Sequence, residues 1–120
     1  MKVLTVDDSL TVRTMVRNIL EEEGIQVVEA ENGQEALDVV TSQQDINVIL
    51  LDWEMPIMDG FTFLTEVRTK NLAPSTKIVM LTTLNKMSNI LKAIEAGADE
   101  YIMKPFTPDV VLEKIHAVAG

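Results

Sequence analysis

Hydrophobic and polar positions along the chain fall into two alternating patterns. Short apolar or β-branched runs, which are typical of strands, lie at residues 2–6, 25–30, 46–51, 76–82 and 100–104. Each run is followed by a segment with the character of an amphipathic helix, at residues 12–20, 32–40, 58–68, 87–94 and 111–118. The pattern therefore predicts five strands that alternate with five helices.

Turn and capping residues separate these elements where the pattern changes. Asp8 or Ser9 is suited to cap the first helix, because a short polar side chain can accept a hydrogen bond from the first turn, and Gly24 is placed to end that helix. Asp59-Gly60 predicts a turn immediately before the third helix.

A strict strand–helix alternation is typical of an α/β fold with a parallel sheet covered by helices on both faces. A chain of 120 residues suits a single domain over residues 1–120. The run at 46–51 is the most apolar, so we expect it to form a central strand, whereas 25–30 is expected at an edge. In such a sheet the C-terminal strand ends share one edge, where ligands bind.

Chemically distinctive side chains stand at the predicted strand ends. Asp7 and Asp8 end the first strand, Asp52 the third, Thr82 the fourth and Lys104 the fifth. Taken singly, each has an ordinary structural explanation, such as a helix cap, a turn residue or a solvated surface charge. Taken together, three carboxylates on one rim repel one another unless a cation lies between them. Oxygen ligands without a nearby His or Cys favour Mg²⁺.

The same side chains suit phosphoryl transfer. A metal ion on the rim neutralises phosphoryl oxygens, Lys104 supplies a positive charge and Thr82 a hydroxyl donor. Asp52 is predicted to be the nucleophile because it ends the most apolar strand. Asp7 and Asp8, adjacent in sequence, are better placed as metal ligands.

Composition narrows the class of protein. The net charge of -9 argues against direct binding to nucleic acid, which requires clustered Lys and Arg. The chain has no cysteine, so disulfides and thiolate metal sites are excluded. No apolar stretch is long enough for a spanning helix, and the first apolar run ends at Asp7, too early for a signal peptide. We therefore expect a cytoplasmic protein that inserts into no membrane.

Four motifs carry a resemblance to a known family. They are VDDS at 6–9, LLDWEMPIMDG at 50–60, MLTT at 80–83 and YIMKPF at 101–106, each at a predicted strand end. In this order they resemble the receiver domain of two-component response regulators over the whole chain, and most of all the single-domain, CheY-like receivers of chemotaxis. The resemblance implies a flavodoxin-like, doubly wound sheet of five parallel strands in the order 2-1-3-4-5, with five helices.

The resemblance also implies a role for each acidic residue of the rim. Asp52 resembles the phosphoacceptor, which takes a phosphoryl group from the phosphohistidine of a histidine kinase. Asp8 resembles a direct Mg²⁺ ligand, together with Asp52 and the backbone carbonyl of Glu54. Asp7 resembles a ligand that acts through water.

Three further residues resemble the parts of a switch. Thr82 is similar to the hydroxyl residue that moves to meet the phosphoryl group, and Lys104 to the lysine that pairs with a phosphoryl oxygen. The bond between Lys104 and Pro105 resembles a cis peptide of the family. Tyr101 is similar to the aromatic residue that turns inward when Thr82 moves.

The implied function is a phosphorylation-dependent signalling switch in a two-component system, which catalyses only its own phosphorylation and dephosphorylation. The expected partners are a sensor histidine kinase and a downstream target, either a flagellar motor component or another effector. The target is expected on the face formed by residues 87–94, 100–104 and 111–118, with the protein a monomer. Glu54 and Leu84 occupy positions that govern hydrolysis in the family and leave the lifetime of the phosphoryl group open.

Other classes of protein are less consistent with the sequence. The segment DWE at 52–54 is similar to the Asp-x-Asp motif of haloacid-dehalogenase-type phosphohydrolases, but those enzymes begin with their nucleophile strand. An FMN-binding flavodoxin-like module would place its phosphate beside Asp7 and Asp8, which would repel it. A phosphotransfer protein would need an active histidine, and the only one is His116 on the last predicted helix.

Trp53 is the single tryptophan and directly follows the predicted phosphoacceptor. We expect its ring to be half-exposed at the rim. Its fluorescence would then report events at Asp52.

Overall fold

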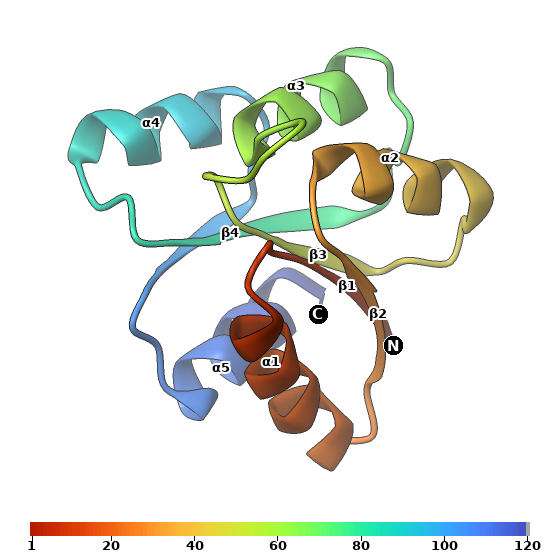
Figure 1. Ribbon diagram of the computed structural model, residues 1–120, viewed down its shortest axis with the longest axis vertical. Helices are drawn as coiled ribbons and strands as arrows, with labels where there is room; N and C mark the ends of the chain where they lie inside the picture. Colours follow the sequence, from red (N-terminus) through yellow and green to blue (C-terminus); the bar gives the residue numbers. More distant parts are fainter. Residues whose placement is uncertain (120) are drawn as a thin grey trace.

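The computed structural model describes residues 1–119, which form a five-stranded parallel sheet and five helices (Figure 1). The elements in chain order are β1 (Lys2–Val6), α1 (Leu10–Glu22), β2 (Gln26–Ala30), α2 (Gly33–Ser42), β3 (Val48–Leu51), α3 (Gly60–Thr69), β4 (Lys77–Thr82), α4 (Met87–Glu95), β5 (Glu100–Met103) and α5 (Pro108–Ala119). The strand order is β2-β1-β3-β4-β5 and every pair is parallel. The predicted fold class and strand order are confirmed.

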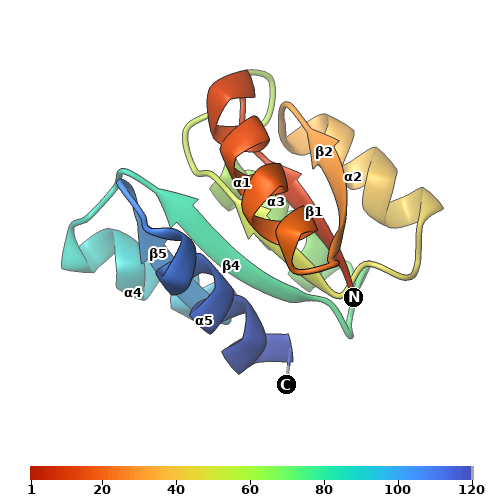
Figure 2. The ribbon, with the colours of Figure 1, turned by 90° about the horizontal axis from the view of Figure 1, so that it is seen from below.

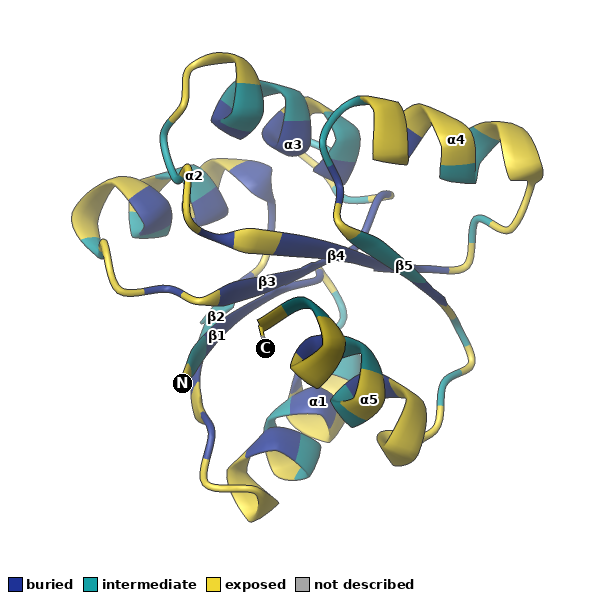
Figure 3. Ribbon diagram, turned by 180° about the vertical axis from the view of Figure 1, so that it is seen from behind, coloured by how far each residue is buried: buried dark blue, intermediate teal, exposed yellow. Residues whose placement is uncertain are grey.

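Helices cover both faces of the sheet. Figures 1 and 2 show α1 and α5 on one face and α2, α3 and α4 on the other. One core lies on each side: Val16 of α1 and Ile115 of α5 pack on the face covered by α1 and α5, and Phe63 and Leu64 of α3 pack on the face covered by α2, α3 and α4. All four residues of β3 are buried, as expected for the central strand, and β2 lies at an edge (Figure 3).

Side-chain caps fix where α1 and α3 begin, and both caps lie beside the C-terminal edge of the sheet. The Oγ of Ser9 accepts a hydrogen bond from the N–H of Val12 at 3.2 Å, so Ser9 rather than Asp8 caps α1. Asp59 caps α3 in the same way, through the N–H of Thr62 at 2.8 Å. Because Ser9 is the N-cap residue of α1, the carboxylate of Asp8 is not used to cap this helix and is available for other contacts.

Helix α4 differs from the expectation for an amphipathic helix. Its apolar stripe includes Met87, Leu91 and Ile94, yet all three are exposed, Met87 by 66%. Only Ala93 of this helix is buried. In β5, at the edge of the sheet, only Ile102 is buried. Periodicity thus predicted the helix but not the exposure of its apolar stripe. Neither α4 nor any other helix within residues 1–119 is long and apolar enough to cross a membrane.

Candidate functional site

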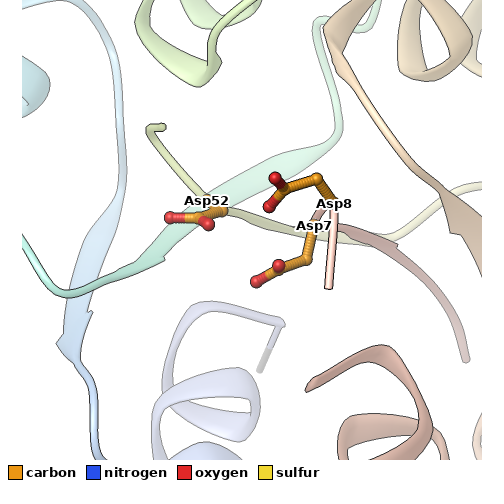
Figure 4. Close-up of side chains that lie close together, drawn as sticks. All are labelled: Asp7, Asp8 and Asp52. Atoms are coloured by element: carbon orange, nitrogen blue, oxygen red, sulfur yellow. The ribbon is translucent and has the colours of Figure 1, made fainter. Parts of the chain in front are cut away.

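Three carboxylates gather where β1 and β3 end. These strands are neighbours in register, with Val6 opposite Leu51, so the residues that follow them are brought together. One carboxylate oxygen from each of Asp7, Asp8 and Asp52 lies within 4.8 Å of the other two, and Figure 4 shows the three side chains side by side. Asp7 and Asp52 are buried, Asp52 being 7% exposed, whereas Asp8 is exposed. The predicted acidic rim is therefore a compact cluster with one accessible member.

Lys104 brings a positive charge into this cluster from β5. Its Nζ donates to Asp7 Oδ2 at 2.7 Å and to Asp52 Oδ2 at 3.3 Å. The backbone N–H of Lys104 donates to the carbonyl oxygen of Thr82 at 2.9 Å, which ties the end of β5 to that of β4. The peptide bond between Lys104 and Pro105 is cis. Lys104 thus lies beside the carboxylates, as the sequence predicted.

The environment of the site shifts the pKa values of Asp52 and Lys104. Burial raises the pKa of Asp52 above its ordinary value, and the charge of Asp7 adds to the shift, while Lys104 and the Trp53 N–H offset only part of it. Burial alone would lower the pKa of Lys104, but its contacts with Asp7 and Asp52 outweigh burial and raise it. The side chain of Lys104 therefore stays protonated, and positively charged, at neutral pH.

The donor set at this rim fits a hard divalent cation. Three carboxylates face one ammonium, which leaves excess negative charge, and the ligand atoms on offer are all oxygens. A magnesium ion in proteins takes only a few carboxylates and keeps several waters, which suits a rim with an exposed member. The side chain of Glu54 is exposed and lies outside the cluster found among residues 1–119. The resemblance assigns a metal contact only to the backbone carbonyl of Glu54.

Thr82 and Tyr101 are joined through one residue. Thr82 is fully buried at the end of β4, and its Oγ1 accepts a hydrogen bond from the N–H of Leu84 at 3.3 Å. The carbonyl oxygen of the same Leu84 accepts from the hydroxyl of Tyr101 at 2.7 Å. Burial, and then the charge of Asp52, raise the pKa of Tyr101, which keeps this hydroxyl a donor. Leu84 is therefore hydrogen-bonded to both Thr82 and Tyr101.

Trp53 is more buried than expected. Its ring is stacked on Phe61 with the centroids 5.3 Å apart, and the residue is only 9% exposed, so the expectation of a half-exposed ring is wrong. The reason is the path of the loop: the N–H of Gly60 donates to the carbonyl oxygen of Trp53 at 2.8 Å, which folds the loop back and lays Phe61 over the indole. The backbone N–H of Trp53 donates to Asp52 Oδ1 at 2.7 Å, so Trp53 contacts the site directly.

Two residues that hold the site were missed by sequence reasoning. The N–H of Ser9 donates to Asp7 Oδ1 at 2.9 Å, and a guanidinium nitrogen of Arg13 donates to the carbonyl oxygen of Asp7 at 2.6 Å. The contact of Ser9 is made by its backbone, which leaves no signal in the sequence. Arg13 did leave one, because it lies on the apolar face of α1 in line with Val16 and Leu20.

Ile57, in the loop between Asp52 and α3, has a strained backbone. Its φ is 69° and it is 83% exposed, and β-branched residues are disfavoured in this left-handed region. We expect Ile57→Gly to raise the free energy of unfolding by about 0.5–1 kcal/mol, because relief of strain exceeds the added flexibility of the unfolded chain. Denaturant unfolding measures this change.

Asn71→Gly is the matched control for Ile57→Gly. Asn71 also has a positive φ, of 53°, but asparagine tolerates this conformation, so its replacement should gain less than half as much. A loss of stability in Ile57→Gly would contradict the assignment of strain to this loop.

Comparisons with known proteins agree on one family. The family model described as response regulator receiver domain matches residues 3–116. A chemotaxis protein CheY homolog of Campylobacter jejuni is 41% identical, over 100% of this chain and 93% of the relative. Chemotaxis protein CheY1 of Helicobacter pylori is 40% identical, over 100% and 98% of the two chains. The solved structure of the chemotaxis response regulator CheY4 of Vibrio cholerae has a TM-score of 0.90 and 37% identity, over 98% of this chain and 97% of that one.

Proposed function

This chain belongs to the response regulator receiver domain family, a family of phosphorylation-dependent signalling domains, and on that premise we propose that Asp52 is its phosphoacceptor. The observation that carries the proposal is the placement of a buried Asp52 against the ammonium of Lys104, beside two further carboxylates. A nucleophile and a charge for the phosphoryl oxygens thus stand at one strand edge.

The proposed reaction is transfer of a phosphoryl group from a phosphohistidine to Asp52. A carboxylate oxygen of Asp52 forms a bond to phosphorus, while the bond from phosphorus to the imidazole nitrogen breaks and that nitrogen keeps the electron pair. Trp53 N–H and Lys104 Nζ hold the two carboxylate oxygens, so the nucleophile is oriented before the donor arrives. Water later attacks phosphorus, the bond from phosphorus to the Asp52 oxygen breaks, and inorganic phosphate leaves while Asp52 returns to its carboxylate form.

We propose that Asp8, Asp52 and the backbone carbonyl of Glu54 hold Mg²⁺, with Asp7 acting through water. The exposure of Asp8 supports its role as a direct ligand. When bound, the ion would neutralise charge on the phosphoryl oxygens.

In the proposed switch, Lys104 and Thr82 pair with phosphoryl oxygens and Tyr101 follows Thr82. The hydrogen bonds that Leu84 shares with Thr82 and Tyr101 support this coupling. The face of α4, β5 and α5 would then change for a partner. This face exposes several apolar side chains, namely Met87, Leu91 and Ile94 of α4 and Met103 of β5. Their exposure supports a surface that binds a partner protein.

Several finer assignments belong to the same proposal. The whole of residues 1–120 forms one receiver domain that acts as a monomer in the cytoplasm. It turns over no external substrate and catalyses only its own phosphorylation and dephosphorylation. A sensor histidine kinase supplies the phosphoryl group, and the target is a flagellar motor component or another effector. The aspartyl phosphohydrolase alternative is not favoured, because the receiver-domain model matches residues 3–116 and the relatives that align over the full chain are chemotaxis proteins.

Trp53 fluorescence provides a direct test of the proposed function. We expect a saturable change on titration with Mg²⁺ and a second change on addition of acetyl phosphate, because the backbone N–H of Trp53 donates to Asp52 and the indole ring is packed on Phe61 beside the site. The return of the signal after removal of the donor would give the lifetime of the phosphoryl group. A protein that responds to neither addition would contradict both the metal site and the phosphoacceptor.

A further inference from the structure

Arg13 is a buried charge that the proposed reaction does not use. It is 7% exposed and lies on the core side of α1 with Val16 and Leu20. A guanidinium removed from water lowers stability unless its donor groups find partners, and a well-packed apolar residue can often replace it. The contacts of Arg13 therefore indicate what its burial achieves.

The guanidinium of Arg13 joins the end of β1 to β2. One terminal nitrogen donates to the carbonyl oxygen of Asp7 at 2.6 Å, and Nε donates to Glu29 Oε1 at 2.9 Å. The other terminal nitrogen lies 3.8 Å from Glu31 Oε1. The planar fork of arginine serves a carbonyl and a carboxylate at once, which a single ammonium cannot do from the same position.

These contacts fix the peptide between Asp7 and Asp8. The N–H of Asp7 donates to the carbonyl oxygen of Ala30 at 3.1 Å, and its own carbonyl is held by Arg13. The backbone is thus held on both sides just before Asp8, the exposed member of the acidic cluster. The orientation of this peptide sets the direction in which the Asp8 side chain leaves the chain.

We propose that Arg13 is a positioning residue for the cation site: it holds the Asp7–Asp8 peptide so that the Asp8 carboxylate meets those of Asp7 and Asp52. This inference rests on the proposed Mg²⁺ site. It differs from a role through charge, because a nearby positive charge weakens the binding of a cation. Loss of Arg13 is expected to weaken Mg²⁺ binding if Arg13 positions Asp8, and to strengthen it if only its charge matters.

Arg17 provides a matched control on the same helix. Its Nε donates to the other oxygen of Glu29, Oε2, at 2.8 Å, and it makes no hydrogen bond to the loop after β1. Burial alone would raise the pKa of Glu29, but Arg17 and Arg13 outweigh burial and lower it, so Glu29 is ionised between the two arginines at neutral pH. Arg13 and Arg17 therefore share one carboxylate, and only Arg13 reaches the Asp7 carbonyl.

The test is calorimetric titration of the full chain with Mg²⁺, together with thermal unfolding of each variant. We expect Arg13→Met to weaken Mg²⁺ binding about tenfold, the scale typical of residues that orient metal ligands. Arg13→Lys keeps the charge but should not restore the affinity, because its ammonium cannot hold Asp7 and Glu29 together. Arg17→Met should lose stability through the shared Glu29 yet bind Mg²⁺ as the wild type does.

Each result decides between the roles. Unchanged or tighter binding in Arg13→Met would overturn the inference, and so would an equal loss of affinity in Arg17→Met. If Arg13→Met does not fold, Arg13→Lys decides: weakened binding supports positioning, and wild-type affinity overturns it. A wild-type chain that binds no Mg²⁺ would overturn the proposed metal site and this inference with it, whereas a wild type that binds isolates the role of Arg13.

Discussion

Replacement of Asp52 by asparagine should abolish phosphoryl uptake and stabilise the fold at the same time. The asparagine side chain has nearly the same shape, and its carbonyl oxygen can still accept the hydrogen bond from the backbone N–H of Trp53. Its amide nitrogen cannot accept the bond that Lys104 Nζ donates to the second oxygen of Asp52, but Lys104 keeps its partner Asp7. Asparagine has no carboxylate to attack phosphorus, so we expect no product after incubation with acetyl phosphate and Mg²⁺. Intact-mass measurement, which detects the gain of one phosphoryl group, checks this.

The gain in stability follows from the electrostatics of the acidic cluster. Burial and the charge of Asp7 raise the pKa of Asp52 above its ordinary value of 3.8, so ionisation costs more in the folded than in the unfolded chain. The wild type should therefore lose stability relative to Asp52→Asn as the pH rises from below 3.8 through the raised pKa. Above it the difference should be constant, at about 1 kcal/mol, in metal-free buffer.

Asp59→Asn is the matched control for Asp52→Asn. It makes the same chemical change seven positions further along, and asparagine also caps helices well, so α3 keeps its cap on the Thr62 N–H. Phosphoryl uptake should persist, and stability should change by no more than about 0.5 kcal/mol. Uptake by Asp52→Asn equal to that of the control would refute the assignment of the phosphoacceptor.

Gly60→Ala should be among the most destabilising single substitutions in the chain. A Cβ at this position would overlap the carbonyl oxygen of Asp52 and lie 2.9 Å from its carbonyl carbon and 3.0 Å from Trp53 Cα. These are backbone atoms, which no change of rotamer can move away. The N–H of Gly60 also donates a hydrogen bond to the carbonyl oxygen of Trp53, which holds the two segments together. We expect a loss of about 3 kcal/mol in the free energy of unfolding, together with weaker Mg²⁺ binding because Asp52 is displaced.

Urea unfolding of Gly60→Ala and Gly24→Ala, measured in parallel, distinguishes two causes of lost stability: steric overlap of the added Cβ and strain in the backbone conformation. Gly24 has a φ of +73°, and a Cβ added there would meet no atom within 4 Å, so its replacement should lose only about 1 kcal/mol, through strain in the left-handed region. That variant should also leave Mg²⁺ binding unchanged, because Gly24 follows α1 at the far end from the site. Equal losses in the two variants would show that close approach at Gly60 is not the cause.

The sequence determined which elements form and what stands at their ends. The apolar runs and the helical repeats placed all five strands and all five helices, with boundaries that differ by only a few residues from those observed. Strand–helix alternation made the sheet parallel, and a parallel sheet brings Asp7, Asp8, Asp52 and Lys104 to one edge whatever the details of packing. The acidic cluster was therefore predictable before any contact was known. The strand order came only through the resemblance to the receiver family.

The sequence did not determine how far particular side chains are buried, because burial depends on which segments pack over them. The burial of Trp53 depends on a loop that returns through Gly60 and on Phe61, eight positions away. The exposure of the α4 stripe depends on the position of that helix over the β5 edge of the sheet. Periodicity reports which residues share a face of a helix, and it carries no information on what that face meets.

The sequence by itself thus determined the fold class, the edge that carries the site and the identities of its charged residues, because these follow from local periodicity and chain direction. Only the tertiary structure decided how these residues are held. Lys104 meets Asp7 across 97 positions of sequence, and Arg13 reaches the Asp7 carbonyl from the core side of α1. Such contacts depend on the packing of distant segments against one another, and no local pattern records them.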